Sequence, residues 1–245
     1  AGPLSQTDST AAGVISTNGA SAALVISTGY LGKATPVTIG GYTESGTLTY
    51  SLFNRGSISS STQNVNANST ALEIIGSDAT NKITLSNGIF NSGTISAKTS
   101  SDSNAASPPV ANAITIGSNV TITPPAGGYA ITNSANGAAA GATTGIGQIA
   151  ATFSGTSPGV ASGIAIGPGA TVSSLLNEGT IGVTAVTSDT TISSLTAVAI
   201  LDQSGTLTTI VNNGTISAQS YAVANGTAVA LDNHQNLAQA LNLSY

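Results

Sequence analysis

The stretch VNNGTISAQS, residues 211–220, occurs in three further close copies in this chain of 245 residues. These are FNRGSISSST from residue 53, FNSGTISAKT from residue 90 and LNEGTIGVTA from residue 176, and a degenerate fifth copy, ITNSANG, begins at residue 131. Repeats of about 20 to 50 residues are typical of solenoids, propellers and arrays. Aligned on their shared asparagine, the copies follow one another at steps of 37, 42, 44 and 35 residues, at Asn54, Asn91, Asn133, Asn177 and Asn212.

Three short strands are expected in each repeat unit. The first follows the asparagine, because an isoleucine lies four residues after it in the clear copies, at Ile58, Ile95, Ile181 and Ile216. The second is ALEIIG from residue 71 and its counterparts AITIGS, GIAIGP, AVAILD and TAVALD, in which apolar residues alternate with small or polar ones. The third leads into the next turn, as in KITLSNGIF, residues 82–90. No sustained helical period of apolar residues competes with this pattern.

The repeat therefore predicts an all-β fold, a parallel β-helix (β-solenoid) of about six coils with loops on one side. Successive coils would lie roughly 4.8 Å apart, so we expect the asparagines to form an amide ladder and the isoleucines an inner apolar stack. The glycine two residues after each clear asparagine is expected to supply a positive φ to the turn. These glycines are Gly56, Gly93, Gly179 and Gly214.

We expect one solenoid segment over residues 1–245. It divides into a divergent first coil at 1–50, repeat units at 51–235 and a C-terminal end at 236–245. Because the chain lacks methionine, we expect it to be a fragment or a processed, exported product of a longer protein.

Composition excludes several classes of partner and site. Charged residues are only 5% of the chain, the formal net charge is −5, and the basic residues are Lys33, Arg55, Lys82 and Lys98. So few bases cannot neutralise a phosphate backbone, which argues against a nucleic-acid partner. The absence of cysteine excludes disulfides and thiolate metal sites. No apolar run approaches the roughly 18 residues of a transmembrane helix.

The motifs FNSGTISA, VNNGTISA and LNEGTIGV, each followed by an AxAI or AxAL strand, resemble the passenger region of bacterial autotransporters and related surface β-helix repeat proteins. The resemblance covers about residues 50–232. It implies a β-helix exported to the bacterial cell surface, associated with the outer membrane. It implies less about activity, because such passengers include adhesins, self-associating proteins, proteases and esterases.

Catalytic groups are sparse. The single histidine, His234, lies two residues after Asp232, but no framed nucleophile accompanies them. Asp202 and Asp232 occupy corresponding positions in neighbouring units, so stacking could pair them as sugar-cleaving acids, although two turn-forming aspartates explain them more simply. We expect no metal and no cofactor.

The leading hypothesis is a non-catalytic extracellular structural or adhesive protein, an autotransporter passenger stalk or a solenoid that assembles end to end into a filament, sheath or surface layer. One alternative is a carbohydrate-active β-helix enzyme, a polysaccharide lyase or hydrolase, acting through Asp202, Asp232 and His234. Another is a host- or glycan-binding adhesin acting through a long loop at 137–160. Expected partners are copies of the chain itself, other surface proteins or a glycan.

Overall fold

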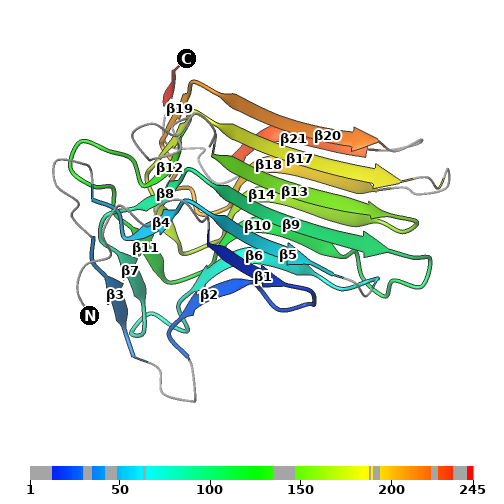
Figure 1. Cartoon of the computed structure of the whole chain (residues 1–245), viewed down its shortest axis with the longest axis horizontal. Coiled ribbons are helices and arrows are strands. Elements are labelled where there is room, and N and C mark those ends of the chain that lie inside the picture. The colour runs from blue at the N-terminus through cyan, green and yellow to red at the C-terminus, as the bar shows by residue number, and fades with distance from the viewer. Residues whose placement is uncertain are drawn as a thin grey trace.

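The computed structural model shows a chain wound into stacked coils of parallel strands (Figure 1). No helix occurs in the part of the chain that it describes. That part comprises residues 13–29, 35–41, 49–62, 65–134, 147–187, 189, 194–221, 226–233 and 242–244.

Two six-stranded sheets carry the longer strands. Sheet A consists of β1 (Val14–Thr17), β5 (Ser57–Ser61), β9 (Thr94–Ser101), β13 (Gln148–Gly155), β17 (Thr180–Thr187) and β20 (Thr215–Tyr221). Sheet B consists of β2 (Leu24–Ser27), β6 (Ser69–Ile75), β10 (Val110–Ile116), β14 (Gly159–Ile166), β18 (Leu195–Asp202) and β21 (Gly226–Asn233).

Two further sheets are built from shorter strands and lie on the left of Figure 1. Sheet C consists of β3 (Val37–Ile39), β7 (Ile83–Leu85), β11 (Val120–Ile122) and β15 (Thr171–Val172). Sheet D consists of β4 (Leu52–Asn54), β8 (Ile89–Asn91), β12 (Ile131–Asn133), β16 (Ser174–Asn177), β19 (Thr209–Asn212) and β22 (Asn242–Ser244).

The predicted fold class is confirmed. In the first four coils the chain passes through sheets A, B, C and D in turn and then returns to sheet A. In the last two coils no described strand belongs to sheet C, and every described strand pairing is parallel. Six strands in each of three sheets give six coils, and one repeat unit makes one coil. Because the described strands of successive coils pair with one another in sheets A, B and D, unpaired strand edges of these sheets occur only at the two ends of the stack.

The first four coils each contain one more strand than the three predicted, and the last two coils have three described strands each. The segment KITLSNGIF forms two strands, β7 and β8, instead of one. Gly88 lies between them with φ of 74°, and Gly127 takes the same φ at this corner of the next coil. A left-handed residue breaks the extended backbone, so the third predicted strand turns a corner at this glycine.

The interior of the solenoid is a set of apolar columns. In sheet A, the register aligns one isoleucine from each coil: Ile15, Ile58, Ile95, Ile149, Ile181 and Ile216. The four inner members are buried, and Phe153 is the largest fully buried side chain. In-register stacking of identical shapes gives a continuous core, as expected from the sequence period.

Extra residues enter the coils at several corners, not at a single one: residues 40–51 connect sheet C to sheet D. Residues 62–68 and 102–109 connect sheet A to sheet B, whereas residues 134–147 connect sheet D to sheet A. At the base of that long connection the backbone N–H of Gly147 donates to the carbonyl of Ser134 at 2.6 Å. The chain therefore leaves and rejoins the stack at the same point.

Candidate functional site

The five repeated asparagines stack in one column where sheet D turns toward sheet A. Each Nδ2 donates to the Oδ1 of the asparagine in the following coil, so the amides form a continuous chain. The distances are 2.7 Å for Asn54 to Asn91, and 2.8 Å for Asn91 to Asn133, Asn133 to Asn177, and Asn177 to Asn212. The three central members are fully buried.

The second amide proton is also used in the first four members. Asn54, Asn91, Asn133 and Asn177 donate to backbone carbonyls in the following coil, those of Thr94, Gln148, Thr180 and Thr215, at 3.2, 3.4, 3.2 and 3.1 Å. A buried asparagine with both donors and its acceptor satisfied has no group left for a ligand. The column therefore acts as an internal support that fixes the turn and the distance between coils.

The glycines beside this ladder have a different role from the one expected. Positive φ values occur at Gly88, Gly127, Gly169 and Gly205 among the described glycines, and the four predicted turn glycines are not in this group. Instead, a Cβ atom on any of those four would overlap the carbonyl oxygen of the glycine stacked one coil before it. They are needed because backbones approach closely, which is the other reason for using glycine.

Sequence reasoning missed two members of these columns. Gly147 takes the glycine place in the coil of Asn133, since a Cβ on Gly179 would overlap its carbonyl oxygen. Ile149 takes the isoleucine place, in register with Ile95 and Ile181. Gly147 ends the long 134–147 connection and Ile149 follows it, so this connection separates both residues from their asparagine in the sequence.

The acidic residues proposed for sugar chemistry do not form a pair. Asp202 pairs in register with Asn233, and Asp232 pairs with Leu201, so the two carboxylates are offset by one residue. Neighbouring residues on a strand point to opposite faces of the sheet. The prediction that Asp202 and Asp232 stack together is therefore wrong, and His234 lies outside the described residues.

Asp202 has a structural role that accounts for its burial. Its Oδ1 accepts hydrogen bonds from the backbone N–H and the hydroxyl of Ser204 at 2.9 and 2.6 Å, and its Oδ2 accepts one from the N–H of Leu207 at 3.2 Å. These are the bonds of an aspartate that organises its own turn. Asp202 is fully buried, and the described residues contain no group of three or more acidic, histidine or cysteine side chains that could hold a metal ion.

The described part of the loop expected at 137–160, residues 147–160, is largely regular structure. Residues 148–155 form β13 in the middle of sheet A, and β14 begins at Gly159. Residues 137–146 lie outside the described residues. The prediction of a long binding loop over this range is therefore wrong for its second half, because the chain has already returned to the stack at Gly147.

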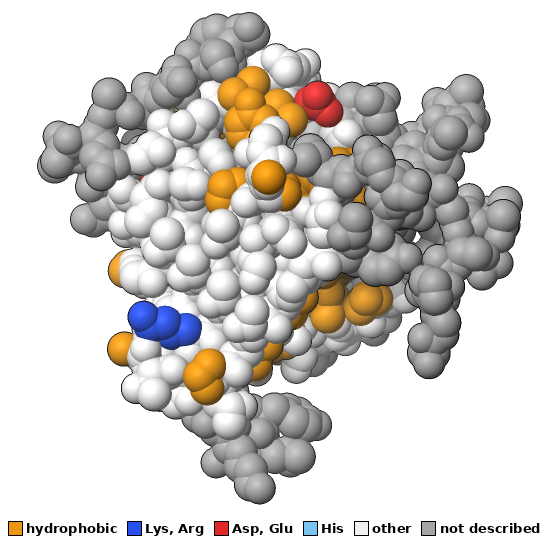
Figure 2. All heavy atoms as spheres, turned by 90° about the vertical axis from the view of Figure 1, so that its left-hand side faces the viewer, with side chains coloured by type: hydrophobic (Ala, Val, Ile, Leu, Met, Phe, Trp, Pro, Cys, Tyr) orange, Lys and Arg blue, Asp and Glu red, His pale blue; other side chains and the backbone are white. Residues whose placement is uncertain are grey.

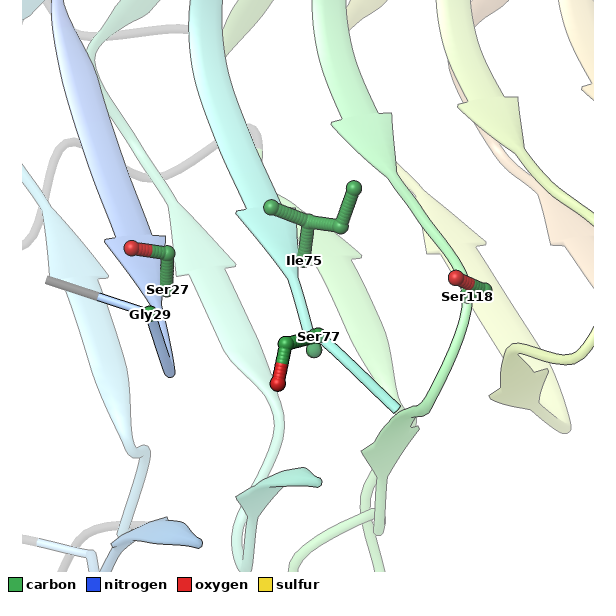
Figure 3. Close-up of a pocket in the computed structure, with 6 residues that line it drawn as sticks. Ser27, Gly29, Ile75, Ser77 and Ser118 are labelled. Atoms are coloured by element: carbon green, nitrogen blue, oxygen red, sulfur yellow. The ribbon is translucent and has the colours of Figure 1, made fainter. Parts of the chain in front are cut away.

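A shallow hollow lies where sheet B turns toward sheet C (Figure 3). It has a volume of about 340 Å³ and is lined by Ser27, Gly29, Ile75, Gly76, Ser77 and Ser118 from three successive coils. None of these lining residues is an acid, base or metal ligand. The hydroxyls here suit weak hydrogen bonding, not catalysis.

A cluster of aromatic side chains lies at sheet D. The rings of Phe53 and Phe90 stack at 4.5 Å between centroids, and Tyr50 lies 4.9 Å from Phe90. The guanidinium of Arg55 lies 4.5 Å from the centroid of Phe53. Burial raises the pKa of the Tyr50 hydroxyl, which also bonds to Thr132 at 3.3 Å.

This aromatic cluster is a poor platform for a sugar. A sugar ring binds to an open aromatic face, but Phe53 has Phe90 near its ring and the Arg55 guanidinium over it. Around it, the surface formed by sheets C and D carries small uncharged groups and scattered apolar ones, with few charges (Figure 2). The stacked rings instead link β4 and β8 of sheet D.

No family model, curated protein or solved structure matches this chain. The described part of the chain has no helix that is long and apolar enough to cross a membrane.

Proposed function

We propose that this protein is a non-catalytic structural or adhesive module of the bacterial cell surface, a rigid β-solenoid that assembles end to end into a filament, sheath or surface layer. The observation that carries the proposal is the asparagine ladder, which runs through five coils and uses the amides of its buried members in hydrogen bonds between coils. Side chains of this kind stabilise stacked β structure over long distances.

The outer faces support the same proposal. Sheet C presents four threonines in register, at Thr38, Thr84, Thr121 and Thr171. The middle outward row of sheet A is equally small and uncharged, at Ser16, Ser59, Ser96, Ala150, Gly182 and Ser217. Flat, regular faces of this kind suit lateral contact with other surface molecules better than they suit a small substrate.

The resemblance to autotransporter passengers leads us to place the protein outside the cell, associated with the outer membrane. The low content of charged residues and the absence of cysteine are compatible with that setting. The competing enzyme hypothesis is weaker, because its two aspartates point to opposite faces of sheet B.

Electron microscopy of the purified chain, together with its mass from light scattering, tests the proposal. We expect filaments or sheets whose axial repeat is a multiple of the strand spacing of about 4.8 Å. Particles of a single chain's mass at all concentrations would refute end-to-end assembly. Cleavage of a polysaccharide that is lost in Asp202→Asn would instead favour the enzyme.

A further inference from the structure

Among the described residues, no strand covers the strands at the N-terminal end of the stack. The outer edges of β1 and β2 pair with no other described strand, and their sequences, VIST and LVIS, contain neither charge nor proline. Natural proteins usually blunt such edges with charges, prolines or bulges. Val14 is 68% exposed and Val25 is 47% exposed, so apolar side chains accompany the open backbone edge.

The core column of sheet A is also open at this end. Ile15 is 43% exposed, although Ile58, Ile95 and Ile181 in the same column are at most 3% exposed. Ile15 occupies a core position, and no described strand is stacked on its outer side. One more coil would complete its burial.

The C-terminal end of the stack presents the complementary edge. β20 reads TISAQSY, again with no charge or proline, and its outer edge pairs with no described strand. Ile216 packs against the core but is only partly buried, and Leu231 of β21 is in the same state. At both ends of the stack, therefore, the columns of core side chains end in a residue that is only partly buried.

We propose that a second copy of this chain completes them. In this arrangement, which rests on the proposed self-assembly, β20 of one copy pairs in parallel with β1 of the next, and β21 pairs with β2. Continuing the register found within the chain places Ile216 opposite Ile15 and Leu231 opposite Leu24. The contact repeats the coil-to-coil contact already present within one chain.

The direction of assembly follows from the chemistry of the stack. Every sheet is parallel and every ladder amide donates toward the C-terminal end, so only head-to-tail stacking continues the pattern. A heterologous contact of this kind does not close on itself, and it gives an open fibre. Sheet D contributes least, because Arg55 covers Phe53 beside its β4 edge.

Cysteine cross-linking in the full chain tests both the partner and the register. The chain contains no cysteine, so the doubly substituted Ser16→Cys, Ser217→Cys protein has only the two new thiols. In the proposed contact these residues are register partners at roughly 4.8 Å, within the Cα range for disulfides. Within one chain they are five strand spacings apart, about 24 Å, which excludes an internal bond.

The matched control replaces Ser217→Cys by Gln219→Cys, two residues along the same strand and on the same face. Its Cα lies roughly 8 Å from residue 16 of the neighbouring copy, beyond disulfide reach. We expect mild oxidation to give a ladder of covalent multimers from the first pair and less than a tenth as much from the control.

Several results would overturn the proposal. Covalent dimers from Ser16→Cys alone would show head-to-head contact. Filaments in the microscope without cross-linking of the first pair would refute this register while leaving the proposed function intact, and an unassembled, uncross-linked chain would refute both. Cross-linking that requires removal of residues 1–12 would show that this segment, not a second copy, occupies the β1 edge.

Discussion

Removing one central ladder amide should destabilise the whole stack. The side chain of Asn133 accepts a hydrogen bond from Asn91 and donates to Asn177 and to the Thr180 carbonyl, at 2.8, 2.8 and 3.2 Å. At about 1 kcal/mol of net stability for each bond, Asn133→Ala should lower the free energy of unfolding by about 3 kcal/mol. The loss of unfolding free energy should approach about 5 kcal/mol if no water replaces the hydrogen bonds that the buried partners lose.

Urea unfolding followed by circular dichroism and by tyrosine fluorescence measures this loss, and coincident transitions justify one free energy. Asn213→Ala is the matched control, because Asn213 belongs to the same motif but its side chain is exposed. We expect that control to stay within about 0.5 kcal/mol of the wild type.

A second variant separates hydrogen bonding from packing. Asn133→Asp keeps the shape of the side chain but replaces its donor with an acceptor that faces the Oδ1 of Asn177. We expect it to be at least as destabilising as Asn133→Ala. A loss under about 1 kcal/mol for Asn133→Ala, or near-wild-type stability for Asn133→Asp, would refute the structural role of the ladder.

Three further predictions concern other parts of the stack. Gly179→Ala should prevent stable stacking, since its Cβ would overlap a carbonyl oxygen, whereas Gly40→Ala, where the Cβ meets nothing, should leave the melting temperature unchanged. Phe153→Ala should lower the free energy of unfolding in urea by about 3–5 kcal/mol. Phe53→Ala should lower it clearly less, because Phe53 is 42% exposed. Hydrogen bonds from Asn81 and the backbone lower the pKa of Asp78 to about 2, below the ordinary 3.8, so its contribution to stability is present above about pH 4 and is lost as the pH falls toward 2. Carbon NMR titration should show this low pKa, and Asp78→Asn should remove the corresponding part of the acid dependence.

The fold was predictable because the repeat places the same residue type at the same point of every coil. Asn133 was identified even in a degenerate copy, since its spacing from Asn91 and Asn177 matches the other steps. Gly147 and Ile149 were not identified, because a fixed offset from the asparagine fails when extra residues intervene. The corner at Gly88 was also missed, because a single glycine within an apolar run does not reveal its φ.

The candidate site was less predictable than the fold. Asp202 and Asp232 occupy similar places in similar motifs, and only the strand register shows that they are one residue out of step. The role of the turn glycines depends on how closely two distant coils approach, which a local turn rule does not contain. The aromatic cluster is likewise assembled across coils, from Tyr50, Phe53 and Phe90.

The closed base of the 134–147 connection makes this protein suitable as a display scaffold. Ser134 and Gly147 are held together by a backbone hydrogen bond of 2.6 Å, and the adjacent Asn133 keeps its place in the ladder. A guest whose termini lie close together can therefore enter here without moving the coils, at an entropic cost that grows only slowly with length. If copies stack as proposed, each filament would carry one guest per chain, at a regular spacing along its axis.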